Sequence, residues 1–492
     1  MRFRLKPSRL GRRRFLKLGG LAGAGLLNRL PTRAGDVEAL GRDLKGRLIL
    51  PDEVGFGFAY RPNNSVYDQD RPIGVAVCAD DSDVQRCILW ARDTGTPFAI
   101  RSGGHNYAGF SCTTGLLINV RAMNRVEVDI ANGTVTAQGG ANNQEMATAL
   151  RKYPVAIPSG RCPTVGISGL ALGGGWGFSA TRTGLCCDTL MRTNVVLADG
   201  SKIEASVSRQ PDLFWALRGG GGGNFGVTTS LTFRLSEVPT LTRFELVWAP
   251  GRHLELIRAL QRIQKTHPRT LSTRSKIAMT RHGARPSPGD LQVECLGVYW
   301  GSINELLEIL QPVLTLQKPT VQNVHHGDFW WIRDSLMTNH PIGLFDTRNQ
   351  YVDSEISEEG IENILRWIGR WPGGSVAQEN LATIFAIGGA VRDIPVSATA
   401  YPHRRSNFIF KMQTQWAPVD KPAVAEAQRS WLRDYHEDMR RFLQPGAYVN
   451  FPMRDFKDWA SAYYGPNLQR LVGIKRRYDP DRVFRFPQSI PT

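Results

Sequence analysis

The sequence predicts an α+β fold with two large units and a short C-terminal segment. Its 492 residues exceed the size of one ordinary domain, and a hydrophobic content of 41% is enough for sizeable cores. Between residues 66 and 237, short apolar runs alternate with glycine-rich turns, which predicts short strands and few helices. From residue 240 the pattern changes to longer amphipathic helices and alternating strands. The expected segments are 1–34, 35–65, 66–237, 238–440 and 441–492.

The chain begins with a basic segment that has the layout of a twin-arginine export signal. Arg12, Arg13 and Arg14 precede a mild apolar run rich in glycine and alanine, and Thr32-Arg33-Ala34 fits a cleavage site. The apolar run is too short to span a bilayer as a helix. These features predict recognition by the twin-arginine translocation machinery and a periplasmic or secreted mature protein without a membrane span. A disordered basic tail is the alternative.

The net charge of +17 points first to a nucleic-acid partner, but its distribution argues against one. The first 34 residues hold ten basic residues and no acidic one, which leaves a charge of +7 for the rest of the chain. No dense basic run interleaved with aromatic residues follows. We therefore expect no nucleic-acid partner.

The first large unit is predicted to open with a β-α-β arrangement. The segment 35–65 is mixed and turn-rich and extends this unit. A strand is expected at residues 74–78, followed by an amphipathic helix that is capped by Asp81 or Ser82 and ends at Gly95. Further strands are expected at 97–100, 116–120, 126–129, 134–137, 193–197 and 226–235, with a short helix at 144–150.

The second unit is predicted to hold an antiparallel sheet with helices on one side. Helices are expected at 256–263, 303–314 and 423–443, and strands at 243–248, 291–300, 383–388 and 408–416. Along the last strand Lys411, Gln413 and Gln415 share one face, which indicates either a cavity lining or a solvated face. The C-terminal segment carries a helix that ends at Asp479-Pro480, and we expect it to pack back on the first unit.

Two loops carry the most distinctive residues. The run from Arg101 to Ser111 places His105 among glycines directly after an apolar strand, so the imidazole is presented on a loop. The run from Gly160 to Gly169 places Cys162 ahead of many glycines, where the backbone can approach a flat group or phosphates. Alone, the histidine is more often an ordinary loop residue and the cysteine a small buried one. Together they indicate two anchors for one cofactor.

Two other patterns in the chain predict less than they first suggest. Residues 221–226 fit Gly-x-Gly-x-x-Gly, but a helix is expected before them and a strand after them, the reverse of a dinucleotide-binding fold. Such glycine turns can still hold a diphosphate through backbone N–H groups. The seven cysteines show no spacing of a zinc site, so no metal is expected. Their odd number is explained by a cofactor bond at Cys162 or by free thiols.

The combined motifs resemble the berberine bridge enzyme-like FAD-linked oxidases, which belong to the vanillyl-alcohol-oxidase-type (PCMH-type) flavoproteins. The motifs are Arg101–Tyr107, Cys162–Gly166, Gly173–Gly177, Asp212–Gly226 and Tyr463–Ile490. The resemblance extends over residues 68–237 and 440–490, and more loosely over the middle. It implies a two-subdomain FAD-binding domain at 66–237, a substrate domain at 238–440 and a family-specific C-terminal segment at 441–492.

The resemblance implies FAD held by an 8α-histidyl bond at His105 and a 6-S-cysteinyl bond at Cys162. Imidazole and thiolate are nucleophiles that can add to an oxidised flavin, and Arg161 either assists thiolate formation or is a surface charge. In this family two bonds go with a high redox potential and an open site. The other residues expected at the cofactor are Arg101, Ser102, Gly103, Gly104, Asn106, Val165, Gly166, Gly169, Gly174, Gly175, Trp176, Gly177, Asn224, Gly226, Val227 and Asn450.

The same resemblance suggests the catalytic base. Oxidation of an alcohol needs a group that takes the hydroxyl proton while hydride passes to flavin N5. In the family this is often the tyrosine of a Tyr-x-Asn motif, here Tyr448 with Asn450, and Tyr107 is expected to lower its pKa by a hydrogen bond. Without the family, Tyr448 is better explained as a packing residue. Trp176 stands where some plant members have tyrosine, so chemistry by a tyrosine pair is not expected there.

The residues around flavin N5 and in the middle domain suggest the reaction. Val165 matches a position where a small side chain is compatible with oxygen access, which favours an oxidase, and Gln413, Gln415 and Glu294 are the expected substrate residues. The hypothesis is oxidation of an alcohol or carbohydrate, such as a sugar hemiacetal or a natural-product hydroxyl, with molecular oxygen as acceptor and hydrogen peroxide as product. The alternatives are a flavin enzyme with another acceptor or with carbon–carbon bond formation, and a non-catalytic flavin- or ligand-binding protein.

Overall fold

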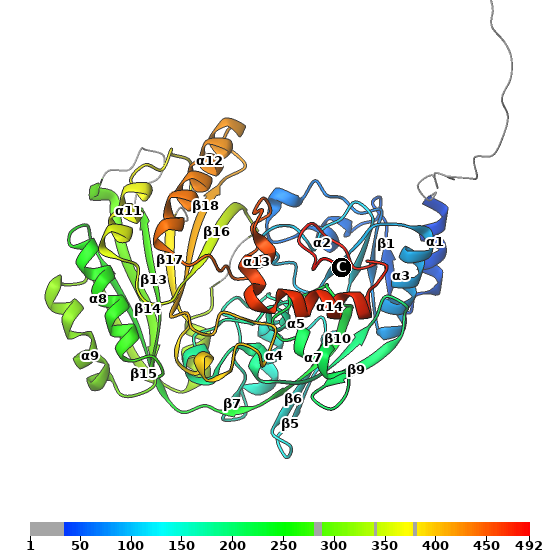
Figure 1. Cartoon of the computed structure of the whole chain (residues 1–492), viewed down its shortest axis with the longest axis horizontal. Helices are drawn as coiled ribbons and strands as arrows, with labels where there is room; N and C mark the ends of the chain where they lie inside the picture. Colours follow the sequence, from blue (N-terminus) through cyan, green and yellow to red (C-terminus); the bar gives the residue numbers. More distant parts are fainter. Residues whose placement is uncertain (1–33, 280–287, 339–341, 377–380) are drawn as a thin grey trace, which may run out of the picture.

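The computed structural model describes residues 34–279, 288–338, 342–376 and 381–492, so the predicted export signal, apart from Ala34, lies outside the described residues. Two lobes lie side by side in Figure 1. One lobe holds a four-stranded and a five-stranded sheet, and the other a seven-stranded sheet. The α+β fold with an antiparallel sheet covered by helices is therefore confirmed.

The four-stranded sheet opens the first lobe. Its elements are α1 (Ala34–Asp43), β1 (Arg47–Ile49), α2 (Phe56–Tyr60), β2 (Gly74–Val77), α3 (Asp81–Thr94), β3 (Phe98–Arg101) and β4 (Leu116–Asn119). Strands β2, β4 and β3 run parallel, and β1 pairs antiparallel with β2. Helix α3 ends at Gly95 in the left-handed conformation, as predicted. Its cap is Asp80 instead of Asp81 or Ser82, because the Asp80 carboxylate accepts from the backbone N–H groups of Ser82 and Asp83.

The five-stranded sheet is antiparallel and carries most of the glycine-rich turns. Its elements are β5 (Val126–Asp129), β6 (Thr134–Gln138), α4 (Asn143–Leu150), α5 (Ile167–Leu172), α6 (Ala180–Thr183), β8 (Leu190–Val196), β9 (Lys202–Ser206), α7 (Pro211–Ala216) and β10 (Val227–Arg234), beside a small pair of β7 (Val155–Ala156) and β11 (Ser236–Glu237). Helix α7 precedes the glycine run 221–226 and β10 follows it. This order is the one predicted, and it differs from a dinucleotide-binding fold.

The second lobe is built on the seven-stranded sheet, with the strand order β15-β12-β14-β13-β17-β18-β16. Its elements are β12 (Leu241–Trp248), α8 (His253–Thr266), β13 (Leu271–Met279), β14 (Leu291–Tyr299), α9 (Ile303–Leu316), β15 (Val321–Gly327), α10 (Phe329–Ser335), β16 (Leu344–Val352), α11 (Glu358–Ile368), β17 (Leu381–Ala386), β18 (Phe408–Trp416) and α12 (Pro422–Met439). Helices α8, α9 and α11 cover the outer face, away from the first lobe (Figure 1). Strands β13, β15 and β16 were not predicted.

The C-terminal segment returns to the first lobe through α13 (Trp459–Tyr464) and α14 (Leu468–Tyr478). Helix α14 lies beside α7 (Figure 1). The buried Lys475 ammonium donates to the carbonyl oxygens of Asn224 (2.6 Å) and Phe484 (2.7 Å) and to the Asp479 carboxylate (2.5 Å). One cation therefore joins the end of the chain to the glycine run of the first lobe.

Two further structural findings concern membranes and cysteines. No helix among the described residues has the length and the apolar character needed to cross a bilayer. All seven cysteines lie in the described part of the chain, and all are free thiols.

Candidate active site

A cavity of about 380 Å³ lies where the two lobes and the C-terminal segment meet. Its walls come from the loop after β3, the segment around Cys162, the glycine run 221–226, strands β17 and β18, and the C-terminal segment. His105, Cys162, Tyr107 and Tyr448 all line it. The fold thus brings together side chains that lie up to hundreds of residues apart in the sequence.

The loop after β3 presents His105 to the cavity. The Arg101 guanidinium donates to the carbonyl oxygen of Ser111 at 2.7 Å and to that of Tyr60. Gly104 has a φ of 74°, a left-handed conformation that favours glycine. Arg101 therefore supports the loop from outside the cavity wall.

The first turn of α4 holds the segment that carries Cys162. Asn143 Nδ2 donates to the carbonyl oxygen of Cys162 at 2.8 Å. The backbone N–H groups of Asn143 and Gln144 donate to the carbonyl oxygens of Val165 and Pro163, both at 3.0 Å. These N–H groups have no partner inside the helix, so the loop satisfies them. The backbone at Cys162 is thereby given a defined position.

The His105 loop and the Cys162 loop are in direct contact. A Cβ atom on Gly103 would lie 2.2 Å from the Gly166 nitrogen, and one on Gly166 would lie 2.2 Å from Ser102 Oγ. Only glycine fits at both positions. A hydrogen bond of 2.8 Å joins His105 Nε2 and Thr164 Oγ1. The two candidate anchors are therefore held in one rigid arrangement.

The surroundings keep the His105 imidazole neutral, whereas at Cys162 burial and the nearby charges act in opposite directions. Burial lowers the pKa of His105 to about 4, so its imidazole is neutral at ordinary pH and keeps a lone pair on one nitrogen. Burial raises the pKa of the Cys162 thiol, whereas the positive charges of Arg161, Lys411 and Arg274 act in the opposite direction. Three cations thus favour thiolate formation at Cys162, and Arg161 is one of them.

The hydroxyl oxygen of Tyr448 accepts three hydrogen bonds. They come from the backbone N–H groups of Gly175 (2.9 Å) and Trp176 (3.1 Å) and from Asn450 Nδ2 (3.1 Å). Burial raises the pKa of Tyr448 to about 12, and the three donors act in the opposite direction. A phenol offers two lone pairs, whereas a phenolate can accept a third donor. The three donors therefore stabilise the deprotonated form, but burial has the larger effect on the pKa and favours the neutral phenol.

The predicted hydrogen bond from Tyr107 to Tyr448 is not among the contacts of the described residues. The N–H groups of Gly175, Trp176 and Asn450 donate to the Tyr448 hydroxyl instead. Phe451 packs against both rings, with its centroid 5.3 Å from that of Tyr107 and 5.1 Å from that of Tyr448. Lys411 Nζ lies 5.7 Å from the centroid of the Tyr107 ring and 5.6 Å from that of Phe451, within the range of a cation–π interaction. Burial raises the pKa of Tyr107.

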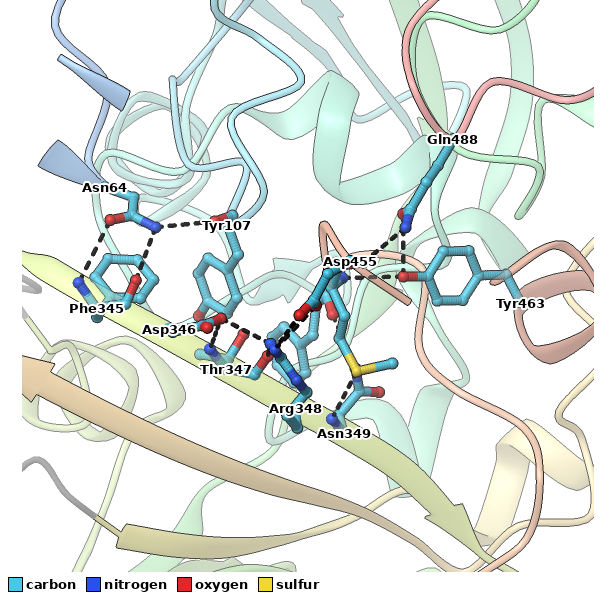
Figure 2. Close-up of polar contacts among 12 residues, drawn as sticks. Asn64, Tyr107, Phe345, Asp346, Thr347, Arg348, Asn349, Asp455, Tyr463 and Gln488 are labelled. Carbon is cyan, nitrogen blue, oxygen red and sulfur yellow. Dashed lines mark hydrogen bonds and ion pairs between the residues drawn. The ribbon is translucent and has the colours of Figure 1, made fainter. Parts of the chain in front are cut away.

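Strand β16 connects the second lobe to the loop of Tyr107 and to the C-terminal segment (Figure 2). Asn64 Nδ2 donates to the carbonyl oxygens of Tyr107 (2.9 Å) and Phe345 (3.1 Å). On the other side, the Arg348 guanidinium donates to the Asp455 carboxylate at 2.9 Å. These contacts hold the second lobe against the loops that line the cavity.

The buried Asn349 on the same strand holds the segment that contains Tyr448. Its Oδ1 accepts from the Tyr448 backbone N–H at 2.7 Å, and its Nδ2 donates to the Phe451 carbonyl oxygen at 2.8 Å. Asn349 has no exposed surface. One amide group therefore holds both ends of the segment 448–451, which carries Tyr448 and Asn450.

The glycines along the cavity leave room for a large ligand. A Cβ atom on Gly169 would meet no described atom within 4 Å, and one on Gly222 would meet its nearest neighbour at 3.8 Å, although both residues line the cavity. Asn224 Nδ2 donates to the Gly220 carbonyl oxygen at 3.0 Å, which fixes the glycine run. Because glycine has no side chain, these parts of the wall leave open space in which a ligand can approach the backbone closely.

Most of the residues predicted at the site line this one cavity. They are Ser102, Gly103, Gly104, His105, Asn106, Tyr107, Cys162, Val165, Gly166, Gly169, Trp176, Asn224, Gly226, Gln413, Gln415, Tyr448 and Asn450. The predicted residues outside the wall are Arg101, Gly174, Gly175, Gly177, Val227 and Glu294. Gly175 instead contributes its N–H group to Tyr448, and Glu294 is paired with Arg274 at 2.5 Å.

Several residues at the site were missed by the sequence interpretation. Lys411 was predicted on the polar strand face with Gln413 and Gln415 but was not named among the substrate residues, and it lines the cavity with them. Asn349 lies on a strand whose polar and apolar residues do not alternate, so no sequence pattern indicated that it lies at the site. Thr164 lies two residues beyond Cys162 and faces His105 only because the two loops meet.

Comparisons with known proteins agree with this geometry. A family model described as FAD binding domain matches residues 72–206, and one described as berberine and berberine like matches residues 447–491. The chain is 30% identical over 460 residues to the FAD-linked oxidoreductase YgaK of Bacillus subtilis. The aligned region covers 91% of this chain and 97% of YgaK.

Two solved structures are similar over nearly the whole chain. BBE-like 1 of Physcomitrella patens is 26% identical with a TM-score of 0.82, covering 92% of this chain and 99% of that chain. The glucooligosaccharide oxidase of Acremonium strictum, described with a 6-S-cysteinyl, 8α-N1-histidyl FAD, is 25% identical with a TM-score of 0.81, covering 93% of this chain and 99% of that chain.

Proposed function

The chain belongs to the berberine bridge enzyme-like family of FAD-linked oxidoreductases, and we propose that it oxidises an alcohol or a carbohydrate with a bicovalently bound FAD and molecular oxygen as acceptor. The single observation that carries the proposal is that His105, Cys162 and Tyr448 line the same cavity. The 6-S-cysteinyl, 8α-N1-histidyl FAD of the related glucooligosaccharide oxidase supports the two attachments.

The residues of the cavity fit the cofactor. His105 would hold it through an 8α-histidyl bond and Cys162 through a 6-S-cysteinyl bond, because a neutral imidazole and a thiol in a cationic field are both nucleophiles. The side-chain-free walls at Gly169 and Gly222 leave space for the flat ring and for the diphosphate. When bound, FAD takes hydride from a carbon and passes the electrons to oxygen.

Tyr448 is the proposed catalytic base. Its phenolate oxygen takes the proton of the substrate hydroxyl, and the N–H groups of Gly175, Trp176 and Asn450 stabilise the charge before that transfer. Asn450 also donates to the Leu170 carbonyl oxygen at 2.9 Å, so its amide is fixed in orientation. The base is thereby aimed without having to reorganise during the reaction.

The substrate side of the cavity is polar on one strand and aromatic around it. Lys411 Nζ donates to Gln413 Oε1 at 2.7 Å, and Gln415 follows on the same face of β18. Phe345 and Phe385 line the adjacent wall. Amide groups beside aromatic rings suit a ligand with several hydroxyl groups, which supports an alcohol or carbohydrate substrate. Glu294 lies outside the wall and has no part in this binding.

Two more parts of the proposal concern oxygen and export. Val165 lines the cavity with a small side chain, which supports access of molecular oxygen. The twin-arginine pattern in residues 1–34 supports export as a folded, cofactor-loaded enzyme to the periplasm or beyond.

Mass spectrometry of the denatured, purified protein tests the central claim. We expect FAD on the His105 peptide and on the Cys162 peptide of the wild-type protein. His105→Ala and Cys162→Ala should each lose one of the two covalent bonds. The control variants His267→Ala and Cys112→Ala should keep both bonds. Oxygen consumption and peroxide yield are then measured with a panel of alcohols and oligosaccharides. An active enzyme without covalent flavin at either residue would contradict the attachment, and turnover without oxygen uptake would contradict the oxidase.

A further inference from the structure

Thr164 is the hydrogen-bond partner of the imidazole that is proposed to bind the cofactor. Its Oγ1 lies 2.8 Å from His105 Nε2, and no described residue bonds to Nδ1. Thr164 belongs to the loop that carries Cys162, so one loop supplies the cysteine and holds the histidine. The ring plane of His105 is therefore set by the neighbouring anchor.

The contact between the two loops leaves this hydrogen bond little freedom. Gly103 and Gly166 pack so closely that neither position accepts a Cβ atom. The carbonyl oxygen of Thr164 would lie 2.7 Å from a Cβ on Gly103, so the Thr164 backbone takes part in the same contact. Both loops are also fastened to one carbonyl oxygen, that of Gly139, by Ser102 Oγ at 2.8 Å and by Ser168 Oγ. The Thr164 hydroxyl is thus held at a constant place beside the His105 ring.

A neutral imidazole carries its proton on one nitrogen and its lone pair on the other. A hydroxyl oxygen that accepts from Nε2–H leaves the lone pair on Nδ1. Because burial keeps His105 neutral, the choice of tautomer decides which nitrogen can attack. The Thr164 side chain is solvent-exposed enough to donate its own proton to water while it accepts from the ring.

Resting on the proposed covalent attachment, with the N1-histidyl (Nδ1) linkage described for the glucooligosaccharide oxidase, we infer that Thr164 is a positioning residue: its hydroxyl holds His105 with the proton on Nε2, which leaves Nδ1 free to bond to the methyl carbon of the flavin. The hydroxyl serves both sides of the reaction. It accepts from Nε2–H before attachment and can turn to donate to Nε2 afterwards, when that proton has been lost.

The attachment balances in atoms and electrons with oxygen as the oxidant. The Nδ1–carbon bond forms and one C–H bond of the methyl group breaks. The two electrons of the broken bond pass into the ring and on to molecular oxygen. The proton from carbon and the proton from Nε2 leave with them as hydrogen peroxide. Thr164 contributes only the placement of the ring and has no net gain or loss of a proton.

The test compares Thr164→Val, which keeps the shape but has no hydroxyl, with Thr164→Ser, which keeps it. Thr113→Val is the matched control, because Thr113 lies in the His105 loop region and accepts from the Gly115 N–H at 2.9 Å without contacting His105. Peptide mass spectrometry measures flavin on His105 and on Cys162 in each full-length protein. The linked nitrogen is identified by NMR of the isolated histidyl-flavin.

We expect Thr164→Val to lower the occupancy of His105 by about tenfold, the effect of one lost hydrogen bond, and to yield linkage at Nε2 as well as at Nδ1. Occupancy of Cys162 should stay at the wild-type level, which shows that the cavity still binds FAD. Thr164→Ser and Thr113→Val should retain full Nδ1 linkage.

Two results would overturn the inference while the proposed function stands. One is wild-type occupancy with Nδ1 linkage alone in Thr164→Val. The other is loss at both anchors in a folded Thr164→Val, because Thr164 would then shape the cavity instead of placing His105. Wild-type protein without any flavin on His105 would instead contradict the proposed function itself.

Discussion

At the scale of single residues, the proposed function depends on how the phenol oxygen of Tyr448 is surrounded. Tyr448 is 1% exposed, and burial alone disfavours its phenolate. The N–H groups of Gly175 and Trp176 can point at this oxygen because Gly174 and Gly175 have φ values of 116° and 89°, which are strained for any residue with a side chain. Gly174 and Gly175 therefore allow the backbone to donate to the hydroxyl oxygen of the proposed base.

Replacement of Tyr448 by phenylalanine removes the base and keeps the ring. We expect the rate of flavin reduction by substrate to fall by about 100-fold to 10,000-fold, because general base catalysis contributes that much. Anaerobic stopped-flow absorbance measures this rate, with covalent flavin content as the check on cofactor loading. Tyr401→Phe is the matched control, since Tyr401 is equally buried but does not line the cavity. Equal rates in the two variants would exclude Tyr448 as the base.

The pH dependence follows from the pKa of the same group. The base acts when deprotonated, and burial raises the pKa of Tyr448 to about 12, so the active fraction grows as pH rises. We expect kcat/KM to increase about tenfold per pH unit between about pH 7 and pH 10, without a plateau. Asn450→Leu removes one donor, raises the pKa further and lowers kcat/KM about tenfold at each of these pH values. A plateau near neutral pH would show that another group takes the proton.

At the scale of elements, the site is made by the contact of two loops. Gly166→Ala places a Cβ 2.2 Å from Ser102 Oγ and 2.6 Å from the Gly103 nitrogen, so the loops must separate. We expect a loss of about 1 to 3 kcal/mol in the free energy of unfolding and less flavin on both anchors. Thermal unfolding and peptide mass spectrometry measure the two effects. Gly473→Ala in α14, where a Cβ meets no described atom within 4 Å, should show neither.

Elements also explain what the sequence interpretation missed. Strand β18 was predicted with its polar face, because Lys411, Gln413 and Gln415 share one face while Phe410 and Met412 on the other face enter the core. Strand β16 was not predicted, because both of its faces are buried and residues such as Arg348 and Asn349 are satisfied by partners about a hundred residues away. No local pattern records such partners.

At the scale of the whole molecule, the C-terminal segment closes the site. Phe484, Arg485, Phe486 and Gln488 line the cavity, and Lys475 holds this end of the chain to the glycine run. The cavity is thus complete only when the last residues have folded back.

Replacement of Lys475 by methionine tests this closure. The variant leaves the Asp479 carboxylate buried without its cation, and both residues have fully buried side chains. We expect the free energy of unfolding to fall by about 3 to 5 kcal/mol and the flavin content to decrease. Thermal unfolding followed by flavin absorbance measures both. Arg476→Met, at the exposed neighbouring position, should leave both unchanged; the same loss there would mean that α14 tolerates no substitution.

Sequence patterns were enough to predict the α+β class, the inverted order around the glycine run, and the two loops with His105 and Cys162. These are local properties, because a strand followed by glycines forms a loop in which the next side chain is accessible, and this depends on neighbouring residues alone. The contacts that those side chains make depend on how the chain packs in three dimensions. His105 and its partner Thr164 are 59 positions apart in the sequence. The backbone donors of Gly175 and Trp176 are 273 and 272 positions from Tyr448. Asn349 is 99 and 102 positions from the two ends of the segment 448–451 that it holds. Such contacts arise from the packing of two lobes and a returning C-terminus, which periodicity and spacing do not encode.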